Sequence, residues 1–407
     1  MKVLLINCVY KVGSTGKIVF DTQQYLEANG HEVYVAFGNK GESKLPYAYR
    51  FCTLTEARIH SRLAMFGRNQ YKGLCAPTRR LLNYIEEVKP DIVHVHCANG
   101  FTVNLFALFE HLKKNDIKTV VTHHAEFYYT GSCGHAFDCE QWFRNECKEC
   151  PRPQSSTFNR IFANPHADWI KMYSAFKGFK KENLVFTSVS PWVNKRAVMS
   201  PITNGYDHRV VLNGLDTNVF HHYDRSCISD KRLSSIQQDK IIFHATAVFN
   251  ANDPSYPKGG YYIKELAKRM PDVAFVVASL ATQDADNLPD NLILWGRTQS
   301  QVELAQLYSI SDLCVITSNR ETFSMVTAES LCCGTPVVGF MAGGPESIAL
   351  SEFSSFVEYG NIDELEMKIK ECLASKHDYD LIQSRASALY SKETMASNYL
   401  EIYKSLL

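Results

Sequence analysis

The feature that most constrains the fold is an alternation of short apolar runs with helical patterns, which occurs twice along the chain. The first series of apolar runs comprises Val3–Ile6, Glu32–Phe37, Ile92–His96, Thr119–His123 and Leu184–Val189. The second series follows Val210–Leu212 and comprises Ile241–Ala245, Val273–Ala278, Leu292–Leu294, Leu313–Thr317 and Pro336–Phe340. Strands that alternate with helices form parallel sheets covered by helices. The sequence therefore predicts an α/β protein with two doubly wound, Rossmann-like domains that face a central cleft.

The length of the chain also favours two domains, because 407 residues exceed what one hydrophobic core usually supports. We expect an N-terminal domain over residues 1–208, a C-terminal domain over 209–390 and a final helix over 391–407. In that last segment the apolar residues Met395, Tyr399, Ile402, Tyr403 and Leu406 recur at helical spacing. A helix with this pattern can pack back on the N-terminal domain.

Composition excludes some classes of partner. Lys plus Arg and Asp plus Glu both total 43, so the chain has no overall basic field and we expect no nucleic-acid partner. No apolar run reaches the length of a membrane span, and the first ten residues are interpreted as a buried strand. The odd number of cysteines, 13, predicts reduced thiols and a cytoplasmic location.

A glycine-containing turn follows the first expected strand, with the sequence Gly13-Ser14-Thr15-Gly16-Lys17. Its glycines permit close backbone approach, and the helix that follows offers free N–H groups to a phosphate. The glycine spacing matches neither the dinucleotide fingerprint nor a phosphate-binding P-loop. A tight turn without a ligand is the alternative interpretation.

A second candidate site follows the run Leu313–Thr317. Glu321 falls in the loop after this strand, and Glu329 falls on the helix that the loop leads into. The backbone N–H groups around Phe323–Val326 would lie at the start of that helix, where they suit a diphosphate.

Glu321 and Glu329, separated by seven residues, resemble the paired-glutamate motif of retaining family-4 glycosyltransferases, which have the GT-B fold. Other segments in the order of that family are Gly13-Ser14-Thr15-Gly16, Pro90–His96, His124, Asn213–Asp216, Lys258-Gly259 and Gly343–Glu346. The chain is most similar to the branch of colanic-acid-type exopolysaccharide and O-antigen enzymes. The resemblance implies transfer of a sugar from a nucleotide-sugar donor to a lipid-linked glycan acceptor in polysaccharide biosynthesis, without a cofactor.

The resemblance also implies roles for individual residues. Glu321 would stabilise positive charge on the donor sugar, Lys258 would neutralise the leaving diphosphate in place of a metal, and His124 would contact the donor sugar. The remaining donor-binding candidates are Gly16, Glu329, Thr322, Phe323, Ser324, Met325, Gly296, Arg297 and Arg320. The acceptor-binding candidates are Ser14, Thr15, His96, Asn99 and Glu126.

Two positions depart from the family pattern or admit a structural alternative. The family commonly has an arginine shortly before the lysine, whereas this chain has none over His244–Asn250, so Arg320 or Arg297 would supply that charge. For His124 the alternative is a hydrogen-bonded structural histidine, and His94 is expected to be structural.

The cysteines Cys133, Cys139, Cys147 and Cys150 lie close together in the sequence and end in a Cys-x-x-Cys pair. This spacing is compatible with a structural zinc site, for which His135 is a rival ligand. Free or redox-active thiols are an equal alternative, and disulfides rank last because the expected compartment is reducing.

Residues 58–80 contain six basic residues interleaved with apolar ones: Arg58, Arg62, Arg68, Lys72, Arg79 and Arg80. Such a surface can dock on anionic lipid headgroups, which predicts contact with the inner face of the plasma membrane. A solvated helix face is the alternative.

Two other functions compatible with the same fold stay open. The chain could be a non-catalytic protein that binds a nucleotide sugar or a glycan, or a sugar-nucleotide epimerase. A dehydrogenase is not expected, because no Gly-x-Gly-x-x-Gly with a following acidic residue ends the first strand of either domain.

Overall fold

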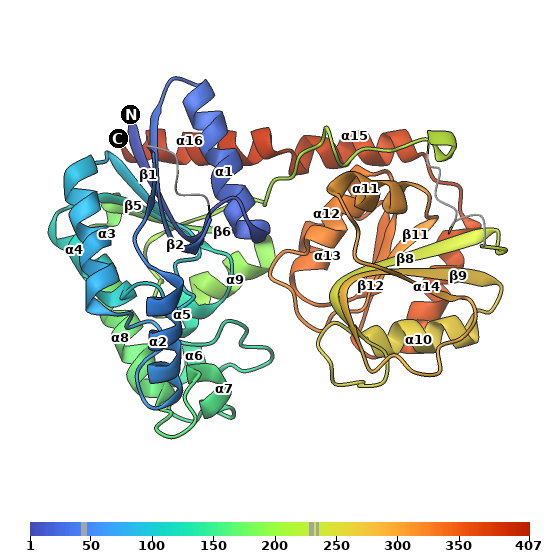
Figure 1. Ribbon diagram of the computed structural model, residues 1–407, viewed down its shortest axis with the longest axis horizontal. Coiled ribbons are helices and arrows are strands. Elements are labelled where there is room, and N and C mark those ends of the chain that lie inside the picture. The colour runs from blue at the N-terminus through green and yellow to red at the C-terminus, as the bar shows by residue number, and fades with distance from the viewer. Residues whose placement is uncertain (42–46, 228–231, 233–235) are drawn as a thin grey trace. The chain divides into compact units, whose positions relative to one another are not determined.

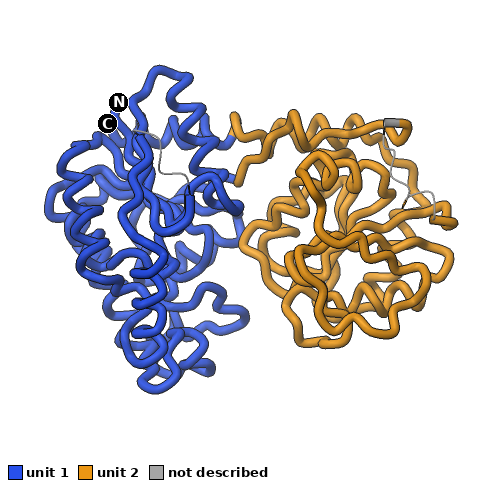
Figure 2. Tube along the Cα trace, viewed as in Figure 1, with its two compact units in different colours: residues 1–212, 395–407 blue, residues 213–394 orange. Residues whose placement is uncertain are grey.

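The computed structural model describes residues 1–41, 47–227, 232 and 236–407. It divides the chain into two compact units, which Figure 2 shows in different colours. Unit 1 comprises residues 1–212 and 395–407, and unit 2 comprises residues 213–394. Each unit contains one parallel sheet flanked by helices (Figure 1), which confirms the predicted fold class.

The sheet of unit 1 has seven strands in the order β3-β2-β1-β4-β5-β6-β7, and every pair is parallel. The strands are β1 (Lys2–Val9), β2 (Glu32–Lys40), β3 (Ala48–Arg50), β4 (Ile92–Val95), β5 (Lys118–His123), β6 (Leu184–Ser188) and β7 (Asp207–Val210). The apolar run in β1 is fully buried, as expected for a central strand covered on both faces.

The helices of unit 1 are α1 (Gly13–Ala28), α2 (Leu54–Met65), α3 (Cys75–Val88), α4 (Leu105–Lys114), α5 (Phe127–Thr130), α6 (Gln141–Arg144), α7 (Pro153–Thr157), α8 (Pro165–Phe176), α9 (Pro191–Met199) and α16 (Lys392–Leu406), with a 3₁₀ turn over Lys181–Asn183. Several begin at side-chain caps. Thr53 and Glu56 form a capping box at α2, and Asn104 accepts a hydrogen bond from a first-turn amide of α4.

The C-terminal helix α16 belongs to unit 1 from Met395 onward. Its apolar side chains, among them Tyr399 and Tyr403, share a buried cluster with Leu5 of β1, Val35 of β2 and residues of α1. The unit boundary falls after Leu212, a few residues later than predicted. The reason is that β7 pairs with β6, so a boundary at residue 208 would cut a strand of the first sheet.

The sheet of unit 2 has six strands in the order β10-β9-β8-β11-β12-β13, again all parallel. The strands are β8 (Lys240–Asn250), β9 (Val273–Gln283), β10 (Leu292–Gly296), β11 (Leu313–Ile316), β12 (Val337–Phe340) and β13 (Ser354–Val357). The helices are α10 (Gly260–Arg269), α11 (Gln301–Ser309), α12 (Met325–Cys332), α13 (Gly344–Ile348), α14 (Ile362–Ala374) and α15 (Tyr379–Tyr390), and a 3₁₀ turn spans Arg225–Cys227.

Alternation along β8 shows how this sheet is covered on both faces. Ile242 joins a buried cluster with Ile263 of α10 and Leu365 of α14. The next residue, Phe243, packs edge-on against Tyr308 of α11, with ring centroids 4.8 Å apart. Since neighbouring residues of a strand point to opposite faces, α10 and α14 lie on one face and α11 on the other. Within the described ranges, no helix combines the length and apolar character needed to cross a membrane.

Candidate functional site

The strand order places a candidate ligand crevice in each unit. In both sheets the chain winds outward in two directions from a central pair, which is β1 and β4 in unit 1 and β8 and β11 in unit 2. In open α/β sheets, ligands bind outside the carboxyl ends of the strands at such a switch point. The predicted site residues of unit 1 follow β1, β4 and β5, and those of unit 2 follow β8, β10 and β11.

We call the carboxyl ends of the strands the edge of each unit. At the edge of unit 2, Lys258 and Glu321 form an ion pair. Lys258 Nζ donates to Glu321 Oε1 at 2.5 Å, and both side chains are partly exposed. Gly259 brings the two loops together, because it has a φ of +68° and a Cβ there would lie 2.0 Å from the carbonyl oxygen of Thr317. The hydroxyl of Thr317 also donates to the carbonyl of Lys258 at 3.2 Å. A lysine in the loop after β8 is thus held against a glutamate in the loop after β11.

The backbone of Glu321 is fixed from the opposite side. Its N–H donates to the carbonyl of Ala342 at 3.0 Å, and its carbonyl accepts from the N–H of Gly344 at 2.8 Å. A Cβ on Gly344 would lie 2.6 Å from the backbone nitrogen of Phe323, so this close approach requires glycine. Glu346 holds the turn by accepting from the N–H groups of Ala342 and Gly343. These contacts fix the backbone position from which the Glu321 side chain extends.

The helix α12 begins directly after this loop. Ser324 adopts a φ of +80°, uncommon for a residue with a side chain, and its hydroxyl accepts from the N–H of Thr327 at 3.3 Å. Met325 is the first residue of the helix, where backbone N–H groups lack intrahelical partners and favour anions. The Phe323 side chain is buried, so only its backbone is suited to a ligand, whereas Thr322 is half-buried.

Glu329 lies about one turn further along α12. Its Oε2 accepts a hydrogen bond from the hydroxyl of Tyr308 at 3.0 Å. Burial, followed by the nearby Glu329 carboxylate, raises the pKa of Tyr308 well above its usual value, so the phenol stays a donor. Tyr308 orients Glu329. Sequence reasoning missed Tyr308, because it lies on α11 and no motif links it to the glutamate.

The remaining predicted residues of unit 2 differ in position. Gly296 has a φ of +77° and open space beside it, and Arg297 is exposed after β10. In the part of the chain that the structure describes, the ion-pair partner of Glu321 is Lys258 and not Arg297. Arg320 is half-buried and precedes Glu321 directly, and its role at a diphosphate stays a prediction.

In unit 1, the first turn of α1 follows β1. Val12, the N-cap residue, makes no side-chain capping bond, and Ser14 is exposed. Thr15 lies 3.4 Å from the side-chain nitrogen of Asn7. Gly16 is buried, and a Cβ there would lie 3.2 Å from Val9, so this residue lets α1 approach β1 closely. Any ligand contact of Gly16 would therefore be made by its backbone.

A stack of histidines follows β4 and β5. His96 Nδ1 lies 3.1 Å from His124 Nε2, and the rings of His94 and His96 are 3.8 Å apart. Burial lowers the pKa of His124 to about 4 and that of His96 well below its usual range, so both are neutral at pH 7. Among the described residues His96 Nε2 is buried without a hydrogen-bond partner. Asn99, in the next loop, is half-buried.

His94 is structural, as the sequence analysis expects. Its Nδ1 lies 2.5 Å from the hydroxyl of Tyr403, and its Nε2 lies 2.6 Å from the hydroxyl of Thr122. The ring thereby links the C-terminal helix α16 to β5.

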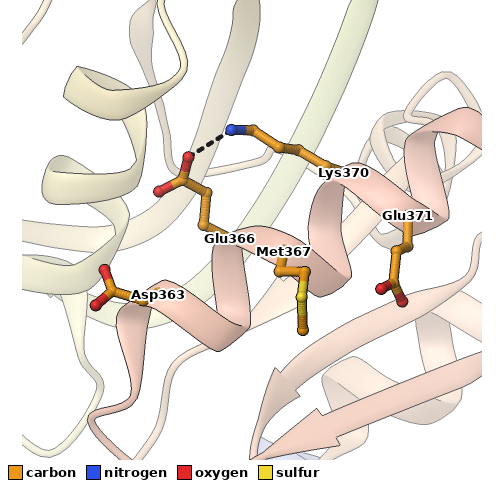
Figure 3. A pocket seen from close by; sticks show the side chains of 5 residues that line it. All are labelled: Asp363, Glu366, Met367, Lys370 and Glu371. Atoms are coloured by element: carbon orange, nitrogen blue, oxygen red, sulfur yellow. Dashed lines mark hydrogen bonds and ion pairs between the residues drawn. The ribbon is translucent and has the colours of Figure 1, made fainter.

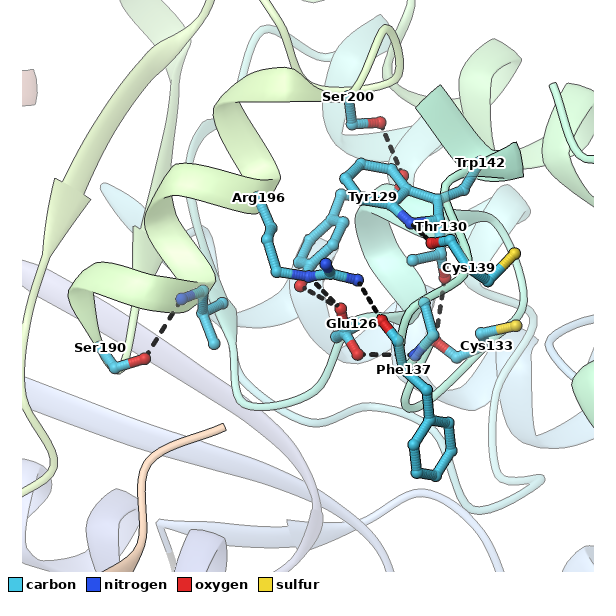
Figure 4. A network of polar contacts seen from close by, with 12 residues as sticks. Glu126, Tyr129, Thr130, Cys133, Phe137, Cys139, Trp142, Ser190, Arg196 and Ser200 are labelled. Carbon is cyan, nitrogen blue, oxygen red and sulfur yellow. Dashed lines mark hydrogen bonds and ion pairs between the residues drawn. The ribbon is translucent and has the colours of Figure 1, made fainter. Parts of the chain in front are cut away.

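Glu126 lies inside unit 1, at the centre of the polar network in Figure 4. Its side chain is fully buried, and Oε1 accepts from Arg196 Nε at 2.7 Å and from the hydroxyl of Tyr129 at 2.9 Å. Oε2 accepts from the N–H of Ala136 at 2.6 Å. Both oxygens accept hydrogen bonds inside the unit, so Glu126 is an internal partner of Arg196, which sequence reasoning did not single out. Its contact with the acceptor stays a prediction.

The four clustered cysteines surround the same network. Those shown in Figure 4, Cys133 and Cys139, are half-buried, whereas Cys147 is buried and its thiol faces the carbonyl of Thr130 at 3.7 Å. Burial raises the pKa of Cys133 to about 12, with smaller contributions from Cys150 and Cys139. Within the described ranges, no group of three or more His, Cys, Asp or Glu side chains is arranged to hold a metal ion. A structural zinc therefore stays a prediction.

One surface hollow lies outside both edges, along α14 (Figure 3). It has a volume of about 430 Å³ and is lined by Asp363, Glu366, Met367, Lys370 and Glu371. Its carboxylates are paired with cations: Lys370 and Arg269 with Glu366, Arg269 with Asp363, and Lys368 with Glu371. No predicted site residue lines this hollow.

Two family models match the chain, one in each unit. Residues 15–170 match the model described as Glycosyltransferase Family 4, and residues 277–388 match the model described as Glycosyl transferases group 1. The first match covers the segment from the start of α1 to α8, and the second contains Glu321, Glu329 and Tyr308.

Curated relatives are similar over parts of their length. A D-inositol 3-phosphate glycosyltransferase of Segniliparus rotundus is 37% identical over 71 residues, which is 17% of this chain and 16% of that protein. An N-acetyl-alpha-D-glucosaminyl L-malate synthase of Bacillus anthracis is 27% identical over 227 residues, which is 49% of this chain and 54% of that protein. The chain thus matches from about a sixth to about half of these relatives' length.

Solved structures are similar over the whole chain. The Anabaena protein HepE in complex with UDP superimposes with a TM-score of 0.69 at 14% identity, with 100% of both chains covered. Sucrose-phosphate synthase of Thermosynechococcus elongatus gives a TM-score of 0.66 at 15% identity, covering 100% of this chain and 98% of that one.

Together these findings define the class as a two-domain protein of the GT-B fold, as the sequence analysis expects. Residues 15–170 are similar to family-4 glycosyltransferases, and residues 277–388 are similar to group 1 glycosyl transferases. Both matches support the predicted class of transferase.

Proposed function

We propose that the protein is a retaining glycosyltransferase that moves a sugar from a nucleotide-sugar donor to a lipid-linked glycan, in the biosynthesis of an exopolysaccharide or O-antigen. The family-4 and group 1 domains support the transferase class and the donor type. The resemblance of the paired glutamates supports the retaining mechanism and the polysaccharide branch.

The observation that carries the proposal is the ion pair between Lys258 and Glu321 at the switch point of unit 2. Each charge is matched to a different part of a nucleotide sugar. The lysine suits the diphosphate, and the glutamate suits positive charge that develops on the sugar as its bond to phosphate breaks. The two groups neutralise each other in the structure, so an incoming diphosphate can replace Glu321 as the partner of Lys258.

The start of α12 supplies the second part of the donor site. Its first-turn N–H groups, from Met325 onward, and Lys258 would share the charge of the leaving diphosphate. Glu329, oriented by Tyr308, would accept a hydrogen bond from a ribose hydroxyl in this proposal. No metal is required for this chemistry.

Attack would occur on the same face of the sugar from which the diphosphate departs, which retains the anomeric configuration without an enzymic nucleophile. The acceptor hydroxyl would lose its proton to the leaving phosphate. His124 would contact the donor sugar, and its neutral imidazole can donate or accept a hydrogen bond there.

The edge of unit 1 supports a neutral acceptor rich in hydroxyl groups. Ser14, Thr15, His96 and Asn99 are uncharged donors and acceptors, and the unpaired Nε2 of His96 is one hydrogen-bonding atom that the described fold leaves unused. A glycan presents hydroxyls that match such groups. The names of the curated relatives suggest a second candidate, a small acceptor such as L-malate or an inositol phosphate.

A panel of nucleotide sugars tests the donor site. We would measure the binding of UDP-, GDP-, dTDP- and ADP-sugars by calorimetry and thermal shift, with and without EDTA. UDP-sugars come first, because solved structures of the same fold hold UDP or UDP-glucose. One tight binder that EDTA does not affect supports the proposal, and no binding across the panel contradicts it.

Product analysis then separates the alternatives. A transferase releases nucleoside diphosphate only when an acceptor is present, and NMR of the product shows the anomeric configuration. A sugar-nucleotide epimerase would change the donor without acceptor. A non-catalytic binding protein would bind the donor and leave it intact.

A further inference from the structure

One surface of unit 1 exposes a group of large apolar side chains. They come from the outer face of α2 and from the loop over residues 158–162, and they are Ile59, Leu63, Phe66, Phe158, Ile161 and Phe162. Phe66 is 62% exposed and Phe162 is 72% exposed. We call these six residues the apolar tip. Contiguous exposed apolar groups of this kind mark interaction surfaces.

The two segments of the apolar tip are held together. The N–H of Arg160 donates to the carbonyl of Met65 at the end of α2, at 3.0 Å. The Phe162 ring lies against Gly67, where a Cβ would come within 3.2 Å of it. The Phe158 ring packs on Phe101, with centroids 5.0 Å apart. The tip is therefore one surface.

The fold holds the loop in this exposed arrangement through Asn159. Asn159 is buried, and its Oδ1 accepts from the N–H groups of Ile161 and Phe162 at 3.0 and 2.9 Å. Its Nδ2 donates to the carbonyl of Phe162 at 3.2 Å. A buried polar residue thus orders a loop whose neighbouring apolar side chains face solvent, the reverse of the usual pattern.

Three arginines lie within the two segments that form the apolar tip. Arg58, Arg62 and Arg160 are exposed, and none makes an ion pair with the acidic side chains that the structure describes. No Asp or Glu occurs from residue 57 to 85 or from residue 150 to 167. On α2, Arg58 and Arg62 lie one turn apart and flank the stripe of Ile59, Leu63 and Phe66.

We propose that the apolar tip docks on an anionic lipid bilayer, with the aromatic and aliphatic side chains in the interface and the arginines at headgroup phosphates. This surface rests on the proposed function, because a lipid-linked acceptor lies at such a bilayer. Charge complementarity identifies the occupant: cationic groups beside an apolar face match anionic headgroups above acyl chains.

This surface differs from the basic segment predicted over Arg58–Arg80. Arg68 is committed to the carbonyl of Gly73 at 2.7 Å, and Arg80 pairs with Glu56. These two arginines are therefore not part of the proposed docking surface. The loop at residues 158–162, which no sequence motif singled out, is part of it.

Cosedimentation of the full chain with vesicles tests the proposal. We expect binding to vesicles of phosphatidylcholine and phosphatidylglycerol, and much weaker binding to phosphatidylcholine alone. The variant Arg58→Glu/Arg62→Glu should bind the anionic vesicles at least about tenfold more weakly, since each cation near such a surface contributes about 1 kcal/mol, or about fivefold. Phe66→Gln/Phe162→Gln should weaken binding in high salt as well, because it removes the apolar part.

Matched variants elsewhere serve as controls. Lys114→Glu/Lys376→Glu makes the same charge change, and Met367→Gln/Leu381→Gln replaces side chains that are also exposed. Both should bind like the wild type, and equal losses in these controls would overturn the proposal. So would a wild-type protein that stays in the supernatant, or tip variants that only convert a dimer of the chain to monomers.

Vesicle binding needs neither donor nor acceptor, so its failure is distinct from failure of the proposed function. All variants should bind the nucleotide sugar with unchanged affinity, because none of the substituted residues lies at the donor edge. A chain that binds vesicles but no nucleotide sugar would retain the docking surface and lose the transferase proposal.

Discussion

The two sheets share one strand order over their first six strands but differ in the chemistry of the carboxyl ends of these strands. At the edge of unit 2, Lys258 and Glu321 are partly exposed and neutralise each other. At the edge of unit 1, the histidines are neutral, and the carboxylate of Glu126 is enclosed by its partners. The comparison teaches that the same scaffold can hold a charged edge suited to a diphosphate and a neutral edge suited to hydroxyl groups. The residues after the strands, and not the fold, set this difference.

The largest effect we expect comes from Glu126 in unit 1, because its ion pair is buried. Glu126→Ala would leave Arg196 without its charge partner and should lower the free energy of unfolding by about 3–5 kcal/mol. Denaturant unfolding measures this loss. Glu401→Ala, which removes the partner of Lys404 in an exposed pair, should cost no more than about 1 kcal/mol. If Glu126 contacted the acceptor instead, its substitution would raise the acceptor KM and leave the stability unchanged.

Substitutions in the ion pair of unit 2 should lower activity and leave stability nearly unchanged. Lys258→Ala and Glu321→Ala each remove a charge that acts on the reacting groups, so transfer should fall by about 10²–10³-fold while the melting temperature stays close to that of the wild type. Steady-state rates measure this effect. Lys268→Ala is the matched control, since Lys268 lies on the neighbouring helix and pairs only on the surface with Glu265. Turnover of either site variant near the wild-type rate would remove these residues from the mechanism.

Acid should destabilise unit 1 before unit 2. Burial lowers the pKa of several histidines of unit 1: His60, His94, His96, His123, His124 and His208. In the described part of unit 2, burial does so at His244. Between the ordinary pKa of 6.5 and about 4, the unfolded chain binds protons that folded His124 does not. Stability therefore falls as pH falls through this window, by about 2 kcal/mol at pH 5 for His124.

Hydrogen exchange resolved along the chain at pH 7 and pH 5 measures this difference between the units. Segments of unit 1 should lose protection first, after correction for the intrinsic exchange rate. Earlier loss of protection in unit 2 would contradict the assignment of neutral, buried histidines to unit 1.

The smallest effect concerns Tyr308, which orients a carboxylate and does not touch the reacting groups in our proposal. Tyr308→Phe keeps the ring against Phe243 and removes the donor to Glu329, so donor affinity should fall by about fivefold, or about 1 kcal/mol. Calorimetry measures the affinity. Tyr390→Phe removes a comparable buried hydroxyl, which donates to the carbonyl of Ile348, and should leave donor affinity unchanged. Equal losses in both variants would show a general effect on unit 2.

Much of the scaffold is predictable because central strands carry local signals. Buried parallel strands such as β1 and β11 are continuous apolar runs, and the glycines that approach a neighbouring backbone, such as Gly259, stand out in the sequence. The short edge strands β3, β7 and β13 were missed, since three or four residues with polar members such as Ser354 carry little periodicity. These strands become evident only from their pairing with neighbouring strands in the structure.

The candidate site was predictable where a motif is local and was missed where a partner is distant. Lys258 and Glu321 were found through the family resemblance, and the structure brings them into contact. Arg196 was missed because its carboxylate partner, Glu126, lies 70 positions away in the sequence. The exposed aromatic residue Phe162 was missed for a similar reason, since a phenylalanine in an apolar run is normally assigned to the core.

The measurement that tests the central claim most directly is release of UDP from a UDP-sugar by the wild-type chain, with and without a lipid-linked glycan acceptor. The account predicts release that depends on the acceptor, a product with the anomeric configuration of the donor, and loss of that release in Lys258→Ala. Release without acceptor, or equal release by Lys258→Ala, would contradict it.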